Sequence, residues 1–136
     1  MVKEALASAD VVVTATRSKE PVFEGRLVRP GTFVAAIGSS KPDTREVDDD
    51  LLRRCARIGV EVKAQTLQET GDFLLANPSS WKEGAVVELK DLVAGRASYV
   101  RRAEDITLYK SVGVGIEDIA VAHAAWRKLT GREAAS

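Results

Sequence analysis

The sequence predicts an α/β fold built on a mostly parallel sheet. Two continuous apolar runs, at residues 10–16 and 32–38, have the β-branched composition of strands that are covered on both faces. Helix-like segments alternate with such runs along the chain, which is the pattern of a layered α/β domain. A length of 136 residues suits one domain of ordinary size.

The first half of the chain predicts three elements around these strands. An Ala-rich helix tail is expected over residues 3–8, before the first strand. Asp48 is a good N-cap for a helix over residues 49–57, because its carboxylate can accept hydrogen bonds from the exposed first-turn amides. Gly59 is expected to end that helix.

The second half continues the alternation with shorter elements. A brief strand is expected at residues 60–62, and one or two helical turns at 66–70 are expected to stop at Gly71. The remaining expected elements are a loop at 77–80, a helix at 88–94 closed by Gly95, a strand at 106–109 and a long helix from about 112 to 129.

Composition and charge exclude several classes of partner. Twenty basic and twenty acidic residues leave no net charge, whereas nucleic acids and anionic membranes select a basic excess. No apolar run approaches the roughly 20 residues of a membrane span, and residues 1–6 lack the features of a signal peptide. We therefore expect a cytoplasmic protein that binds neither nucleic acid nor membrane.

The sequence predicts no metal site and no nucleophile. His123 has no Cys or His at ligand spacing, so we expect a packing or interface residue. The single cysteine, Cys55, cannot form an internal disulfide and is expected to be a small core residue on the 49–57 helix. The acidic run 48–50 could suggest a divalent ion, but before a helix such a run more often serves capping and solvation.

The loops after the first two strands are the predicted ligand-binding region, because ligands bind outside the carboxyl ends of strands in open parallel sheets. Small hydroxylated residues stand there, at 14–18 and 38–42, with ordinary Ser/Thr turns as the alternative. In the loop after the last strand, Asp118 takes the third glycine position of a dinucleotide fingerprint and Glu117 adjoins it, which disfavours a pyrophosphate site. A tight turn, or a ligand contact by Ser111, stays open there.

The last predicted helix is too apolar for a helix in water. Apolar side chains wrap nearly all round it: Ile116, Ile119, Ala120, Val121, Ala122, Ala124, Ala125 and Trp126. A helix that is apolar on all sides is expected to be buried on all sides. We therefore expect a partner surface on another domain or another subunit.

Several segments, in order along the chain, resemble the ornithine cyclodeaminase/mu-crystallin family: residues 9–21, 29–32, 38–48, 69–72, 106–113 and 117–118. The resemblance extends from Lys3 to about Leu129. It implies a two-domain, usually dimeric, NAD(P)-dependent enzyme that moves a hydride between the nicotinamide and the carbon bearing an amino or imino nitrogen. Members include ornithine cyclodeaminases, alanine dehydrogenases and reductases of cyclic imines such as pyrroline- or piperideine-2-carboxylate.

The resemblance also implies roles for individual residues. The expected cofactor contacts are Thr16, Arg17, Ile37, Gly38, Ser39 and Ser111. The expected substrate contacts are Glu69, Val112 and Gly113, and no metal is expected.

Ser40 stands where ornithine cyclodeaminases have an acid/base aspartate, and it is the candidate catalytic residue. A carboxylate can shuttle protons from a substrate amine, whereas an unactivated serine is a poor substitute at neutral pH. Ketimine reductases of the mu-crystallin type resemble this chain in having serine there, followed by a basic residue, proline and aspartate. The resemblance therefore favours imine reduction, with ornithine cyclodeaminase or alanine dehydrogenase activity as alternatives.

The family's glycine-rich phosphate turn and its substrate-binding Lys and Arg lie upstream of the matched stretch. We therefore expect residues 1–108 to be the second half of a NAD(P)-binding Rossmann domain. Residues 109–136 are expected to pack as a terminal helix on an absent N-terminal substrate and dimerisation domain. The expectation is a fragment of an enzyme acting on small imino or amino acids. Alone it should bind NAD(P)H weakly or not at all, and pair as a homodimer or with the missing half. The alternative is a non-catalytic remnant that acts only through association.

Overall fold

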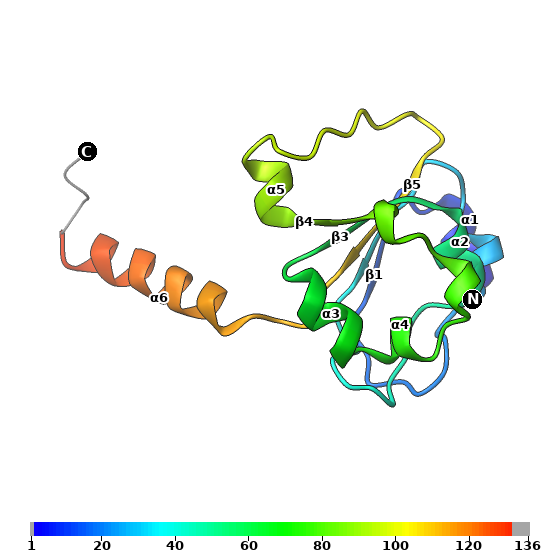
Figure 1. The fold of residues 1–136 in the computed structure, drawn as a ribbon, viewed down its shortest axis with the longest axis horizontal. Helices are drawn as coiled ribbons and strands as arrows, with labels where there is room; N and C mark the ends of the chain where they lie inside the picture. The colour runs from blue at the N-terminus through cyan, green and yellow to red at the C-terminus, as the bar shows by residue number, and fades with distance from the viewer. Residues whose placement is uncertain (1, 132–136) are drawn as a thin grey trace.

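The computed structural model describes residues 2–131, and its centre is a five-stranded, all-parallel sheet (Figure 1). The strands are β1 (Val11–Thr14), β2 (Phe33–Ala36), β3 (Cys55–Val60), β4 (Val86–Glu88) and β5 (Ile106–Lys110), and they lie in the order β1-β2-β5-β3-β4. The predicted α/β class and parallel sheet are confirmed.

The described residues also form six helices and three short 3-10 turns. The helices are α1 (Val2–Ser8), which precedes the first strand, α2 (Asp49–Arg54), α3 (Lys63–Glu69), α4 (Gly71–Leu74), α5 (Leu89–Val93) and α6 (Gly115–Leu129), which follows the last strand. The 3-10 turns are η1 (Gly25–Leu27), η2 (Pro78–Ser80) and η3 (Glu83–Ala85). The predicted N-cap of α2 is confirmed, since the Asp48 carboxylate accepts from the Leu51 amide at 2.8 Å. The predicted end of α5 is confirmed too, because Gly95 follows it with a φ of +68°.

The two faces of the sheet are covered very differently. One face carries the core, in which α2 and α4 pack on alternate strand residues: Val34, Ala36, Ile58, Val60, Ile106 and Leu108 from the strands, with Leu51, Leu52 and Phe73 from the helices. On the opposite face, Val11 and Val13 are 60% and 61% exposed. We call this second side the open sheet face.

The predicted boundary between the 49–57 helix and the following strand is wrong. The helix α2 ends at Arg54, so that Cys55 lies at the start of β3 and not on a helix, and Gly59 lies inside the strand and ends no helix. The reason is non-local, because β3 pairs with both β5 and β4, and this pairing overrides the local helical pattern. Cys55 is a buried core residue, as expected.

The predicted role of Gly71 is also wrong, because Gly71 begins α4 and does not stop a helix. Its amide donates to the carbonyl of Lys41 at 2.9 Å. A Cβ at this position would lie 2.4 Å from the carbonyl oxygen of Thr44, so the glycine allows two segments to approach closely. The strand β4 was not predicted, because three residues carry too little periodicity to mark a strand.

Helix α6 stands away from the rest of the molecule (Figure 1). None of its residues is buried, and Ile116, Ile119 and Val121 are 74%, 69% and 70% exposed. The helix is therefore apolar and is left uncovered by the rest of residues 2–131. Of residues 2–131, no helix combines the length and apolar character that crossing a membrane takes.

Candidate functional site

The loops with most of the predicted cofactor contacts leave the sheet at one edge. The strands β1, β2 and β5 are neighbours, and their last residues are in register, with Thr14 beside Ala36 and Ala36 beside Lys110. Because all strands are parallel, the loops 15–18, 37–41 and 111–114 start side by side at the carboxyl edge of the sheet. This is where an open parallel sheet binds its ligand.

The loops after β1 and β2 meet at Gly38. A Cβ on Gly38 would lie 2.1 Å from both the backbone nitrogen and the backbone oxygen of Thr16, and 2.5 Å from Oε1 of Glu46. A side chain of any size would push the two loops apart, so the position requires glycine. Thr16 and Gly38, both predicted cofactor contacts, are thus brought together by a backbone crossing.

The Glu46 carboxylate ties the two loops to each other. It accepts from the Thr16 amide at 2.5 Å, the Thr16 hydroxyl at 2.8 Å, and the amides of Gly38 and Ser39 at 2.8 and 3.3 Å. The Glu46 side chain is fully buried. Burial alone would raise its pKa, but the hydrogen bonds from Thr16 and Gly38 outweigh burial and hold the pKa of Glu46 below its ordinary value. Glu46 is therefore an anion beneath the edge.

The backbone of Glu46 is held in turn by a buried ion pair between Asp72 and Lys110. One carboxylate oxygen of Asp72 accepts from the amides of Glu46 and Val47, at 2.7 and 3.0 Å. Its other oxygen lies 3.0 Å from the Lys110 ammonium, and both side chains are fully buried. Lys110 also donates to the Ala36 carbonyl at 3.2 Å. We call Glu46, Asp72 and Lys110 the buried charge cluster; it connects β5, α4 and the loop after β2.

The hydroxyl of Ser39 points inward, away from the edge. It donates to the Thr44 carbonyl at 2.5 Å and lies 2.8 Å from the Thr70 hydroxyl. The Thr70 hydroxyl in turn donates to Asp72 at 3.3 Å. The Ser39 side chain therefore helps to hold the loops at the carboxyl edge in place. Its predicted cofactor contact can come only from its backbone.

A cavity of about 290 Å³ opens beside the crossing. Its lining residues are Arg17, Lys19, Gly38, Ser40, Lys41, Asp43 and Thr44. Lys19 pairs with Asp43 at 3.2 Å and holds the pKa of the Asp43 carboxyl below its ordinary value. Three cations and one carboxylate give the cavity a net positive charge. The cavity therefore favours an anionic ligand group, such as a phosphate or a carboxylate. The cavity brings together Arg17, Gly38 and Ser40, three of the predicted site residues.

The predicted substrate contacts lie around the loop after β5. The Ser111 hydroxyl accepts from the Gly113 amide at 3.2 Å, and Gly113 has a φ of +78°. The Gln65 side chain bridges this loop to α3, since its amide nitrogen lies 3.3 Å from the Gly113 carbonyl and 3.1 Å from Glu69 Oε2. Glu69 and Gly113 are thus close neighbours through Gln65, while Val112 is half-buried beside them.

Two predicted site residues, Ile37 and Ser40, are exposed at this edge. Ile37 is 46% exposed. Ser40 is exposed, and its hydroxyl has no hydrogen-bond partner among residues 2–131. Both side chains are therefore accessible to a ligand at the carboxyl edge.

The residues that organise the edge were missed at the level of sequence. Lys110 carried a usable signal, because it follows Ile106 and Leu108 at spacing two and so falls on the core side of its strand. A charged residue at a core position points to a buried partner. Asp72 and Gln65 carried no comparable signal.

The sequence and the structure were compared with known proteins. Residues 1–133 match the sequence model of the ornithine cyclodeaminase/mu-crystallin family. The ketimine reductase mu-crystallin of Mus musculus is 36% identical over 121 residues, which are 89% of this chain and 36% of that protein.

Two solved structures share the fold. The probable ornithine cyclodeaminase from Bordetella pertussis Tohama I superposes with a TM-score of 0.89 at 52% identity, over 96% of this chain and 42% of that one. The Thermococcus litoralis Δ1-pyrroline-2-carboxylate reductase, in complex with NADH and L-proline, superposes with a TM-score of 0.85 at 34% identity, over 95% and 40% of the two chains.

This chain spans about two fifths of the length of these relatives. The family match covers nearly every residue described above, including both loops of the crossing and the whole buried charge cluster. The chain belongs to the ornithine cyclodeaminase/mu-crystallin family.

Proposed function

We propose that this chain forms the nicotinamide side of the cofactor cleft in an NAD(P)H-dependent reductase of cyclic imino acids. The observation that carries the proposal is the crossing of the β1 and β2 loops at Gly38, tied by the buried Glu46 carboxylate. The Thermococcus litoralis relative, which was solved with NADH and L-proline, supports the choice of cofactor and substrate class. Pyrroline- and piperideine-2-carboxylate are the substrates of this class.

The residues at the carboxyl edge fit a dinucleotide. The crossing presents small residues and backbone, so that a flat ring can approach closely, and the adjoining cavity carries the cations Arg17, Lys19 and Lys41. When bound, the nicotinamide supplies a hydride to the imine carbon, and the imine nitrogen gains a proton. In this proposal Thr16, Gly38 and Ser111 position the ring, and Glu69 and Gly113 border the substrate.

Ser40 is proposed to orient the substrate through a hydrogen bond. Its hydroxyl has no base within the cavity other than the Asp43 carboxylate, which is already paired with Lys19. An unactivated hydroxyl does not shuttle protons at neutral pH. Reduction needs only one proton at nitrogen, whereas deamination and cyclisation require repeated proton transfers to and from amines, so Ser40 favours reduction.

Ornithine cyclodeaminase activity is the second candidate. The Bordetella pertussis relative, named a probable ornithine cyclodeaminase, is 52% identical to this chain. The presence of Ser40 at the position of the acid/base aspartate weighs against this candidate. The proposed division of labour gives residues 1–108 to the cofactor side and 109–136 to contact with another part of the enzyme.

A titration with NADH, followed by nicotinamide fluorescence, tests cofactor binding by the chain. We expect weak but saturable binding near millimolar cofactor. Ser40→Asp should weaken binding several-fold, because it adds a negative charge to the cavity. The control is Ser79→Asp, which makes the same exposed change in η2, away from the edge. No saturation at millimolar NADH would contradict the binding proposal and favour a non-catalytic chain.

A chimaera tests the reaction. The matching two fifths of the Thermococcus litoralis reductase would be replaced by this chain, and reduction of Δ1-pyrroline-2-carboxylate by NADH would be assayed. We expect proline to form, and no ammonia to be released from ornithine. Conversion of ornithine to proline without imine reduction would overturn the choice of reaction.

A further inference from the structure

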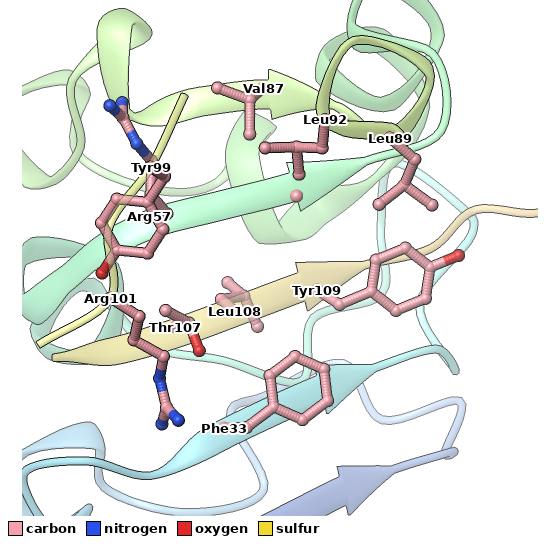
Figure 2. A pocket seen from close by; sticks show the side chains of 11 residues that line it. Phe33, Arg57, Val87, Leu89, Leu92, Tyr99, Arg101, Thr107, Leu108 and Tyr109 are labelled. Atoms are coloured by element: carbon pink, nitrogen blue, oxygen red, sulfur yellow. The ribbon is translucent and has the colours of Figure 1, made fainter. Parts of the chain in front are cut away.

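The loop after β5 is fixed where it leaves the sheet. Tyr109 lines an apolar cavity on the open sheet face, and Figure 2 shows its hydroxyl directed beyond the ends of the strands. This hydroxyl donates to Oε1 of the buried Glu61 carboxylate at 2.9 Å. The Ser111 amide donates to the Ala36 carbonyl at 3.1 Å. The loop therefore starts from a fixed base, and its course beyond that base depends on the contacts of residues 112–114.

Further along the loop, the peptide groups of Gly113 are held on both sides. The Gly113 amide donates to the Ser111 hydroxyl at 3.2 Å, and the Gly113 carbonyl accepts from Nε2 of Gln65 at 3.3 Å. The first bond is local to the loop, whereas the second comes from α3. Among residues 2–131, Gln65 is the one side chain of another element that forms a hydrogen bond with residues 112–114.

The orientation of the Gln65 amide is determined by its two neighbours. Its Nε2 lies 3.1 Å from Oε2 of Glu69, one turn along α3, and 3.3 Å from the Gly113 carbonyl oxygen. A carboxylate oxygen and a carbonyl oxygen only accept hydrogen bonds, so the amide nitrogen must face both of them. Gln65 therefore joins two predicted substrate contacts, Glu69 and Gly113, although the sequence did not indicate Gln65 itself.

The Glu69 carboxylate keeps one oxygen for a ligand. Glu69 is exposed, and within residues 2–131 its Oε1 has no hydrogen-bond partner. In the same range, the carboxylate forms no ion pair. A carboxylate oxygen without a cation suits the N–H of a protonated imino nitrogen, because such charge-assisted hydrogen bonds are strong. The bond from Gln65 restricts how this carboxylate can turn.

We propose that Gln65 is a positioning residue for the imino acid substrate, which it serves by holding Glu69 and the Gly113 peptide at a fixed separation. This inference rests on the proposed function, in which both residues border the substrate. The proposed nicotinamide contacts Thr16 and Gly38 lie on the loops after β1 and β2, away from α3. Loss of the Gln65 amide should therefore weaken substrate binding and leave hydride transfer nearly unchanged.

Steady-state kinetics of the chimaera described above, with NADH and Δ1-pyrroline-2-carboxylate, test this role. Gln65→Met keeps an unbranched side chain and removes both donors, so the KM for the imine should rise about threefold to tenfold. The kcat should stay within about twofold. Gln65→Glu should raise KM further, because its carboxylate repels Glu69. The matched control is Gln68→Met, an exposed glutamine on the same helix, which should leave KM unchanged.

Amide hydrogen exchange in the chain itself, measured by NMR without cofactor, tests the contact independently of any reaction. In Gln65→Met, the Gly113 amide should exchange about threefold to tenfold faster, while the Ser111 amide at the base of the loop is unchanged. Gln68→Met should change neither amide. The melting temperatures of the two variants should agree, because Gln65 is only half-buried.

The two experiments separate the possible failures. An inactive wild-type chimaera would contradict the proposed function, and the exchange result would still decide whether Gln65 holds the loop. An active chimaera whose KM is unchanged by Gln65→Met would overturn the positioning role, as would a fall in kcat without a change in KM. Unchanged exchange of the Gly113 amide in Gln65→Met would overturn it as well.

Discussion

The carboxyl edge of the sheet and helix α6 differ in whether their side chains find partners within the chain. At the edge, three buried charged side chains and two crossing loops bond to one another, and every partner belongs to this chain. On α6, large apolar side chains lie uncovered. The geometry of the edge is therefore an internal property of the chain, whereas the apolar side chains of α6 have no cover among residues 2–131. Substitutions in the two regions should differ accordingly.

The largest expected effect is at Lys110. Lys110→Met keeps most of the length of the side chain but leaves the fully buried Asp72 carboxylate without its cation. Breaking one side of a buried ion pair costs about 3–5 kcal/mol of the free energy of unfolding. Urea denaturation measures the loss. The control is Lys128→Met on α6, which should change the free energy of unfolding of the body by less than about 0.5 kcal/mol. A loss below about 1 kcal/mol at Lys110 would contradict the described cluster.

A smaller effect is expected at Glu46, and it should depend on pH. Glu46→Gln removes the charge that accepts from Thr16 and Gly38, at a cost of roughly 2 kcal/mol near neutral pH. Because the pKa of Glu46 is lowered on folding, its contribution is complete above the ordinary value of 4.5 and is lost as the pH falls through the folded value. The stability difference between wild type and Glu46→Gln should therefore shrink below pH 4.5. A difference independent of pH would show that the charge plays no part.

Two glycine substitutions give the most closely matched comparison. Gly38→Ala places a Cβ against the Thr16 backbone and should cost about 1–3 kcal/mol. Gly84→Ala places its Cβ in open space and should be nearly neutral. Thermal denaturation of the two variants compares them directly. Equal melting temperatures would show that the loops do not cross at Gly38.

The strands that flank the candidate site were predictable from local sequence. Continuous β-branched runs marked β1 and β2, and Asp48 marked the start of α2. The boundary between α2 and β3 was misjudged, because β3 is defined by its pairing with β5 and β4, whose residues lie far along the chain.

The buried contacts that hold the site in place were less predictable from the sequence than the position of the site. Small and hydroxylated residues at the strand ends indicated the edge itself. The link from Glu46 to Asp72 joins residues 26 apart, and the link from Lys110 to Ala36 joins residues 74 apart. Such contacts depend on the strand order, in which β5 lies between β2 and β3, and no local pattern encodes that order.

Amide hydrogen exchange, resolved by residue, tests the central claim that the chain organises the carboxyl edge by itself. At a concentration where the chain is monomeric, the loop amides of Thr16, Gly38 and Ser39 should exchange slowly, because Glu46 accepts from all three. In Glu46→Gln the same three amides should lose protection, while those of β5 keep it. Rapid exchange of the three amides in the wild-type chain, at the rate of an open loop, would contradict the account.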